Sequence, residues 1–326
     1  MSTNNGFEKE QKLMTSFPDK SKKIIPNSSM LASQHLRGFA ITLIPLLGFV
    51  TAIALLNTYQ IGYVEIGLLL GMWILTGSGI TVGFHRHFAH RAFQTNTAIK
   101  VILTIFGCMA GQGPLIYWVT VHRRHHEYSD QPGDPHSPHL QKDGNFAWLY
   151  GLWHAHVNWI FNHEIPNPIY YAPELLRDKI ILKVNQLYLV WLFLGLAIPT
   201  IMGGIIRGSL IGALYGFLWG GLVRLFLCEN MTLSINSITH FYGSRPFHTN
   251  DHSTNNIWLA IPTLGESWHN NHHAFINSAI FGLEWWQFDF GARVIRGLEK
   301  LGLVWDVKIP TKQMIESKKA AYDKVA

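Results

Sequence analysis

Cysteine and charge are both scarce in this sequence. Two cysteines, Cys108 and Cys228, are too few for a disulfide framework or for a metal site built from thiolates. Charged residues make up 14% of the chain and hydrophobic residues 48%, whereas about a quarter of the residues in soluble domains are charged. This composition excludes a disordered chain and disfavours an ordinary cytosolic enzyme. The abundant residues are 12 Trp and 19 Phe, which need a large core or lipid to cover them, and 18 His, almost as many as the 20 acidic residues.

Long apolar runs indicate membrane spans. Five runs contain no Asp, Glu, Lys or Arg, at 38–56, 66–84, 101–121, 184–206 and 208–223, and about 17 to 25 such residues can cross a bilayer. Gly111, Gln112, Gly113 and Pro114 interrupt the third run, so we expect a re-entrant or interfacial element there, or a helix buried beneath the others. Four spans remain as two hairpins, 38–57 with 64–84 and 184–206 with 208–231. The alternative, core helices of a soluble protein, is disfavoured because four such all-round apolar helices are rare in water.

These spans predict an all-α membrane protein whose two hairpins carry a cytosolic helical cap. The parts are an N-terminal arm (1–37), a transmembrane hairpin (38–84), a first cap segment (85–183), a second hairpin (184–231), a second cap segment (232–310) and a tail (311–326). Basic residues fill the arm, whereas the connector after the first span has none, so we expect both termini and both cap segments to face the cytosol.

The N-terminal residues and the net charge bear on targeting and on which partners the protein can bind. Residues 1–35 lack the apolar stretch of a signal peptide. The net charge of +6 is not gathered on one basic face, so nucleic-acid binding is not expected. We expect the basic residues to face anionic membrane lipid instead.

Histidines occur in four groups, three of which follow an apolar run. The groups are His85 and His90; His122, His125 and His126; Asn236 and His240; and His269, His272 and His273. Because residues three or four apart share a helix face, the three histidines of the second group can point into one space, as can those of the fourth. His85 and His90 lie about 140° apart on an ideal helix. That pair therefore straddles a helix end or lies on different sides of a metal pair.

Nine histidines in such groups predict a metal centre. Imidazole suits iron, zinc and copper, and nine rings exceed what one ion accepts, so two metals with a few open positions are expected, most simply two Fe(II) ions. Each histidine taken alone is more simply a residue without a chemical role. Eight histidines outside the four groups are expected to have no metal role: His87, His136, His139, His154, His156, His163, His248 and His252. Among them, His156 is the best candidate to support a metal ligand from behind.

The order of the groups, HxxxxH, HRxHH, NSxTH and HxxHH, resembles the membrane fatty acyl desaturases, in particular the stearoyl (delta-9) acyl-CoA type. The resemblance runs from about residue 38 to Pro310 and includes 133–136 (GDPH), 242–246 (YGSRP) and 265–268 (GESW). It implies that the nine histidines bind two Fe(II) ions, with Asn236 reaching its metal through water. It also implies that Gln112, Trp118 and Thr232 shape the bend of an acyl tunnel.

The resemblance implies an O₂-dependent enzyme that removes two hydrogens from a saturated acyl chain, leaving a cis double bond at about position 9. No flavin, dinucleotide or haem motif is present, so a separate ferredoxin or cytochrome b type electron donor is expected. The basic pair that animal members carry after the His-Val-x-Trp stretch is replaced here by Asn162 and His163, and the segment 141–153 is longer than in those members. The acyl carrier, which could be coenzyme A, a lipid or an acyl-carrier protein, therefore stays open.

Four other functions compete with desaturation. A membrane di-iron hydroxylase or ketolase shares the histidine pattern and differs in its product. A zinc peptidase would need HExxH, which is absent. A metal transporter would place its ligands near mid-membrane, and a bis-histidine haem carrier would leave seven of the nine histidines unexplained.

Overall fold

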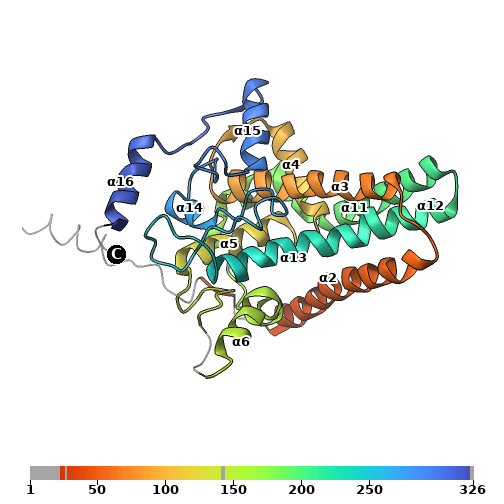
Figure 1. The fold of residues 1–326 in the computed structure, drawn as a ribbon, viewed down its shortest axis with the longest axis horizontal. Helices are drawn as coiled ribbons and strands as arrows, with labels where there is room; N and C mark the ends of the chain where they lie inside the picture. The colour runs from red at the N-terminus through yellow and green to blue at the C-terminus, as the bar shows by residue number, and fades with distance from the viewer. Residues whose placement is uncertain (1–22, 26–27, 141–143, 324–326) are drawn as a thin grey trace, which may run out of the picture.

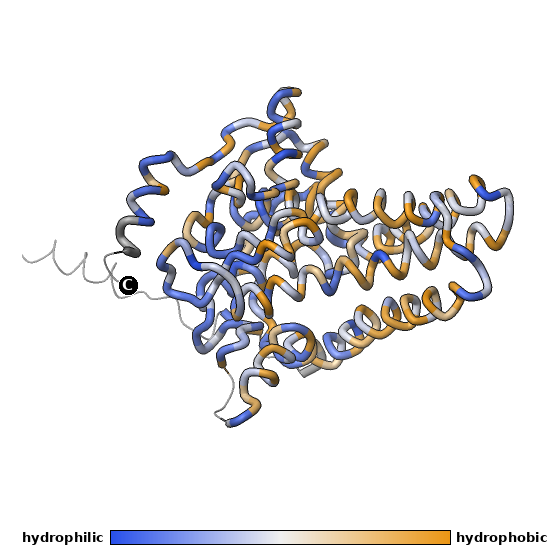
Figure 2. The backbone as a smooth tube through the Cα atoms, viewed as in Figure 1, coloured by the Kyte–Doolittle hydropathy of each residue, from blue (hydrophilic) through white to orange (hydrophobic). Residues whose placement is uncertain are grey.

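The computed structural model describes residues 23–25, 28–140 and 144–323, and most of its regular structure is helical (Figure 1). Within these described ranges, four apolar helices are long enough to cross a membrane, at Met30–Asn57, Tyr63–Ala89, Tyr188–Arg207 and Leu210–His240. They form the elongated bundle on the right of Figure 1, where Figure 2 shows mostly hydrophobic residues. The prediction of four spans in two hairpins is confirmed.

The outer surface of this bundle is suited to lipid. Only 17% of the apolar windows of the first and third spans is buried inside the protein, against 61% for the fourth. Leu47, Phe193 and Leu210 are 63%, 70% and 91% exposed. Because soluble proteins rarely expose so much contiguous apolar surface, lipid must cover these helices. The chain is therefore an integral membrane protein.

The first hairpin consists of α2 (Ser28–Ala54), the 3₁₀ turn η2 (Leu55–Asn57), α3 (Tyr63–Ser78) and the π-helical segment η3 (Gly79–Ala89). The second helix continues past the end of its apolar run at 84, carries His85 and ends at Ala89, just before His90. Gly79 allows this helix to approach α4 (Thr97–Met109) closely, because an added Cβ would lie 2.1 Å from the backbone nitrogen of Gly107.

The second hairpin consists of α11 (Tyr188–Arg207), α12 (Leu210–Tyr215), the π-helical η5 (Gly216–Val223), α13 (Arg224–Ser237) and the 3₁₀ turn η6 (Ile238–His240). It begins at Tyr188 rather than at 184, because residues before it form the separate amphipathic helix α10 (Lys179–Gln186). Gly208 turns the chain with a φ of 61°. Arg207 pairs with Glu65 of the first hairpin at 2.7 Å, which ties the two hairpin ends together.

The interrupted third run forms two short helices. α4 is followed by a turn at 110–114 and then by α5 (Leu115–Tyr128). Gly111 and Gly113 have φ values of +84° and +98°, which favour glycine. α4 packs against η3, α3 and α11. The sequence leaves open either a re-entrant or interfacial element or a helix buried beneath the others. α4 corresponds to the second of these, because it packs among the other helices.

The remaining elements form the cap at the left of Figure 1. They are α6 (Ala147–Trp153), η4 (His154–Asn158), α7 (Trp159–Asn162), α8 (Pro168–Tyr171), α9 (Pro173–Arg177), α14 (His269–Ala274), α15 (Phe290–Lys300) and α16 (Lys312–Asp323), with one antiparallel pair of β1 (Gln94–Thr95) and β2 (Val304–Trp305). The fully buried Arg86 of η3 anchors the cap, since its guanidinium lies 3.0 Å from Glu266 and 2.9 Å from Asp289.

Candidate metal centre

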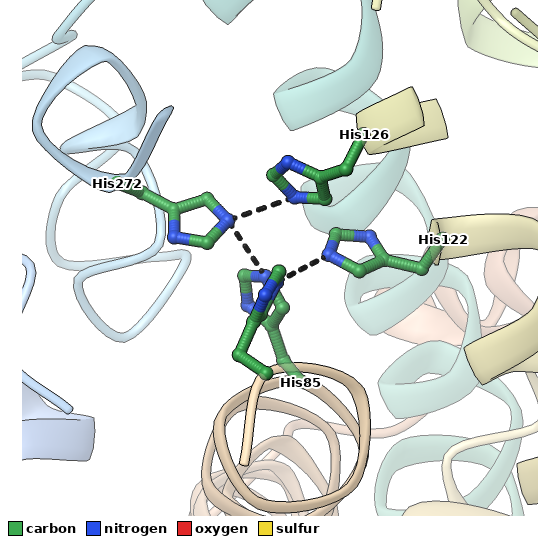
Figure 3. Close-up of side chains that lie close together, drawn as sticks. His85, His122, His126 and His272 are labelled. Carbon is green, nitrogen blue, oxygen red and sulfur yellow. Dashed lines mark hydrogen bonds between the residues drawn. The ribbon is translucent and has the colours of Figure 1, made fainter. Parts of the chain in front are cut away.

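The nine predicted histidines converge on two adjoining buried clusters. Within each cluster the potential ligand atoms lie within 4.8 Å of one another. The first cluster consists of His85, His90, His122, His126 and His272, and the second of His125, His240, His269 and His273. Figure 3 shows His85, His122, His126 and His272 with their rings turned toward one another from three helices, η3, α5 and α14. The rings of His126 and His273 are 4.6 Å apart, so the clusters touch.

Two helices contribute to both clusters. On α5, His122 and His126 are four residues apart and face the first cluster, whereas His125 faces the second. On α14, His272 faces the first cluster, and His269 and His273 face the second. Their common helix face predicts that the three histidines of each motif point into one space. The structure instead divides each motif between the two clusters. The i, i+4 pair stays together and the remaining ring points to the neighbouring cluster.

His85 and His90 both belong to the first cluster. The backbone nitrogen of His90 donates to the carbonyl of His85 at 3.1 Å, the i→i+5 bond of a π-helix. This bond returns the fifth residue toward the side of the first, which an α-helix would not do. η3 ends at Ala89, between the two histidines, so the pair straddles a helix end. This is the first of the two arrangements expected from the sequence. The members of the pair do not lie on different sides of the two clusters.

Buried carboxylates hold the outer nitrogens of four of these rings. The Nδ1 of His125 donates to Asp134 at 3.0 Å, and that of His240 to Asp130 at 2.8 Å. In the same way His273 donates to Asp251 at 2.8 Å, and His85 donates to Glu266. A proton held on Nδ1 leaves the lone pair on Nε2, which then faces the interior of the cluster.

The pKa shifts favour neutral rings for six of the nine histidines and an ionised Asp130, whereas Asp134 outweighs burial at His125 and raises the pKa of that ring. Burial, reinforced by neighbouring histidines, lowers the pKa of five rings well below its usual value: His90, His122, His126, His269 and His272. Burial also lowers the pKa of His273 to about 4, although Asp251 opposes this shift. Burial alone would raise the pKa of Asp130, but the hydrogen bond and charge of His240 reverse its effect and lower it. Neutral imidazole backed by a carboxylate is the form that binds metal ions.

The clusters fit a pair of transition metal ions. Inward-facing Nε2 atoms approach one another at 2.9 Å between His240 and His269 and at 3.2 Å between His85 and His272. Among the described residues, the buried Nε2 atoms of His125 and His273 have no hydrogen-bond partner. Lone pairs that converge without protons are stabilised by a cation, and an all-imidazole set suits iron, zinc or copper. The donor set therefore matches the implied metals.

Two apolar cavities lie beside the clusters. The lining of the first includes His85, His269, Trp73 and Cys228. The lining of the second includes His122, His136, Ile41 and Glu229. Besides His122, four residues predicted from the sequence line both cavities: Gln112, Trp118, Thr232 and Asn236.

Three of these four residues form a hydrogen-bonded group where the two cavities meet. The amide nitrogen of Gln112 donates to the Thr232 hydroxyl at 2.7 Å, and the Trp118 indole donates to the Gln112 oxygen at 3.2 Å. This placement is compatible with a bend between two halves of a tunnel. Asn236 lies one turn before His240 on the helical stretch of α13 and η6.

Sequence reasoning missed the carboxylates and one histidine. Asp134 and Glu266 lie in the GDPH and GESW stretches that carried the resemblance, so that signal was available, whereas Asp130 and Asp251 lie in turns without a recognisable pattern. His136, expected to have no metal role, is buried, stacks on His125 at 4.3 Å and forms a third potential ligand group with His125 and Asp134. His156 instead bonds to Ser237 at 2.9 Å and Asn230 at 3.2 Å on α13.

Comparison with known proteins agrees with this geometry. Residues 60–307 match the family model described as fatty acid desaturase. The chain is 61% identical to the hex-5-enoyl-(acyl-carrier protein) acetylenase of Moorena producens, over 92% of this chain and 94% of the relative. It is 36% identical to the sn-1 stearoyl-lipid 9-desaturase of Synechocystis, over 78% and 74%, and 35% identical to the delta-9 acyl-lipid desaturase 1 of Arabidopsis thaliana, over 81% of each. The chain belongs to the fatty acid desaturase family and is an oxidoreductase that acts on fatty acyl chains with O₂.

Proposed function

We propose that the two histidine clusters hold two Fe(II) ions and that the protein adds an unsaturation to a short acyl chain carried by an acyl-carrier protein. The ligands would be the nine clustered histidines, with Asn236 beside the second metal. The observation that carries this proposal is the pair of buried all-imidazole clusters, one of five rings and one of four, in the wall of an apolar cavity. Bound iron would supply the oxidising power toward O₂ and C–H bonds that no side chain has.

The chain's own residues position the metals and the substrate. The carboxylates of Asp130, Asp134, Asp251 and Glu266 fix the tautomer and orientation of four rings. Phe281 packs against His272 at 4.4 Å between ring centroids and helps to exclude water from the first cluster. A hydrocarbon chain offers no polar group to recognise, so the shape of the cavity would select the carbon pair presented to the metals.

The acyl-carrier protein is proposed as carrier because of the relative at 61% identity, whose name specifies a hex-5-enoyl chain on that carrier. The relatives named for position 9 of lipid acyl chains are about 35% identical. We therefore propose a bond position near the carrier end rather than the delta-9 position implied by the sequence resemblance. A delta-9 lipid product is the alternative outcome of the same assay.

We further propose that the clusters face the cytosol and receive electrons from a separate ferredoxin or cytochrome b type protein. The basic residues of the N-terminal arm support this orientation. The first histidine group follows the apolar run of the first hairpin and His240 follows that of the second, so both hairpins present their histidines at the same end. A soluble donor can reach that end without crossing the bilayer.

The test is expression in a bacterial host with an acyl-carrier protein loaded with hexanoyl or hex-5-enoyl chains, followed by mass analysis of the chains. A desaturase product is lighter by two hydrogens, whereas a hydroxylase product is heavier by one oxygen. His85→Ala in the first cluster and His269→Ala in the second should each abolish the product while the protein stays in the membrane. An iron-loaded protein that removes no hydrogen from any acyl chain, or full activity in both variants, would refute the proposal.

A further inference from the structure

Glu229 is a buried carboxyl group in the apolar part of the protein that the metal centre does not use. It lies on α13, three residues before Thr232 and seven before Asn236, and its residue is only 7% exposed. It lines the second cavity, together with Tyr117 and Trp159. It also lines a third cavity with an apolar wall that includes Leu192 and Leu222. Glu229 thus lies between the second cavity, beside the metal clusters, and a third cavity lined by apolar side chains.

Among the described residues, the Oε1 of Glu229 has no hydrogen-bond partner. The buried cation on the same helix does not pair with it, because Arg224 donates to the carbonyls of Met109 at 2.7 Å and Gly195 at 2.8 Å. A buried carboxyl oxygen without a hydrogen bond is destabilising, and ionisable residues inside membrane spans usually mark functional sites. A partner from outside the chain would remove this cost.

A hydrocarbon cannot be that partner, because it offers no donor. A tunnel built only for a long acyl chain would place methylene groups against the carboxyl and increase its desolvation. Two of the other polar groups that line the second cavity, Gln112 and Thr232, bond to each other. The unpaired atom therefore indicates that a ligand brings a polar group to this depth.

We propose that Glu229 accepts a hydrogen bond from the first amide N–H of the carrier arm of a short acyl thioester, so that the second cavity holds the arm and not the acyl chain. This inference rests on the proposed function. An acyl-carrier protein holds its acyl chain as a thioester, and two carbons beyond the sulfur the arm continues with an amide. That amide is the first hydrogen-bond donor along the ligand.

The distances agree for a short chain. The seven residues from Glu229 to Asn236 span about 10 Å along the helix axis. From carbon 5 of an acyl chain to the first amide nitrogen there are about eight bonds, which extend to about 10 Å at roughly 1.2 Å each. A chain reacting at carbon 9 would move the amide about 5 Å further away and leave methylene groups beside Glu229. Glu229 would therefore select acyl chains that react close to the carrier.

The experiment compares two probes of equal length on the purified full chain in detergent. One is the hexanoyl thioester of N-acetylcysteamine, which has the amide, and the other is the hexanoyl thioester of an alkanethiol, which lacks it. Wild type should bind the amide probe about two- to tenfold more tightly, because the net contribution of one buried hydrogen bond is about 0.5–1.5 kcal/mol. Glu229→Leu should lose this preference, whereas Glu229→Gln, which keeps an acceptor oxygen, should keep part of it.

Two controls protect the interpretation. Glu316→Leu removes an exposed carboxylate of α16 and should leave the preference unchanged. Glu229→Leu should fold at least as stably as wild type, because it removes an unpaired buried group. An equal preference in wild type and Glu229→Leu, or none in wild type, would overturn the role of Glu229. Binding needs no turnover, so a wild type that prefers the amide but makes no unsaturated product refutes the proposed function and leaves the role of Glu229 intact.

Discussion

Asp130 and His240 are 110 positions apart in the chain and are joined by a hydrogen bond of 2.8 Å from the ring Nδ1 to the carboxylate. The same carboxyl group accepts the Ser137 hydroxyl at 2.6 Å and the backbone N–H of His252 at 2.8 Å. These bonds fix a carboxylate from the turn after α5 against the last residue of η6. Because the Asp130 carboxylate orients a proposed metal ligand, substitution of Asp130 tests directly whether the residues behind the ligands contribute to metal affinity.

Asp130→Ala should weaken metal binding while the histidines stay in place. Loss of a carboxylate behind a ligating histidine typically costs 10- to 100-fold in metal affinity. Iron content after dialysis against a graded chelator should show this loss, with Asp130→Asn in between because its amide oxygen still accepts from His240. Asp306→Asn is the matched control, since Asp306 is exposed and its φ of 52° suits asparagine. Equal iron retention in Asp130→Ala and wild type would contradict the assignment.

The sequence predicts the spans and the metal chemistry because both depend on local pattern. The length of an apolar run predicts a membrane helix, and histidines three or four apart predict a shared helix face. The division of His122, His125 and His126 between two clusters depends instead on how α5 packs against η3 and α14. Asp130 and Asp251 lie in turns, and Asp130 has a φ of 56°, so no periodic signal marks them.

Thr232→Val should alter the product more than the metal content. The substitution keeps the side chain's shape but removes the acceptor for Gln112, which lies 2.7 Å away. Loss of one such bond, about 1 kcal/mol, should lower kcat/KM about fivefold and loosen the placement of the carbon pair. Mass analysis of the chains should show a wider spread of bond positions at unchanged iron content.

The matched control for this prediction is Thr200→Val. The Thr200 hydroxyl donates to Leu196 of its own helix at 2.7 Å. This change removes the same atoms from α11, outside the lining of the first two cavities, so the product spectrum should stay that of wild type. A wild-type product spectrum in Thr232→Val would show that the hydrogen-bonded group does not shape the bend.

Arg224→Leu should destabilise the bundle. The fully buried guanidinium donates to Met109 at the end of α4 and to Gly195 in α11, at 2.7 and 2.8 Å, and so joins three helices. The variant leaves both carbonyls without this donor, at roughly 1–3 kcal/mol each. Thermal unfolding in detergent should show a Tm lower by several degrees, while Arg296→Leu, which breaks an exposed pair with Glu299, should change it little. A Tm for Arg224→Leu within a degree of wild type would contradict this role.

Acid should destabilise the cap partly through His163. Burial lowers the pKa of this ring to about 4, although a hydrogen bond to the Trp159 carbonyl opposes the shift, and its Nε2 lies 3.1 Å from the Tyr117 hydroxyl. Because the folded pKa lies below the unfolded value of about 6.5, the stabilisation is complete above pH 6.5 and is lost as the pH falls toward 4. Between pH 7.5 and 5.5 this one ring should cost roughly 1 kcal/mol. Unfolding curves of the metal-free protein should therefore show a larger drop in Tm over this range for wild type than for His163→Gln, and parallel drops would contradict the assignment.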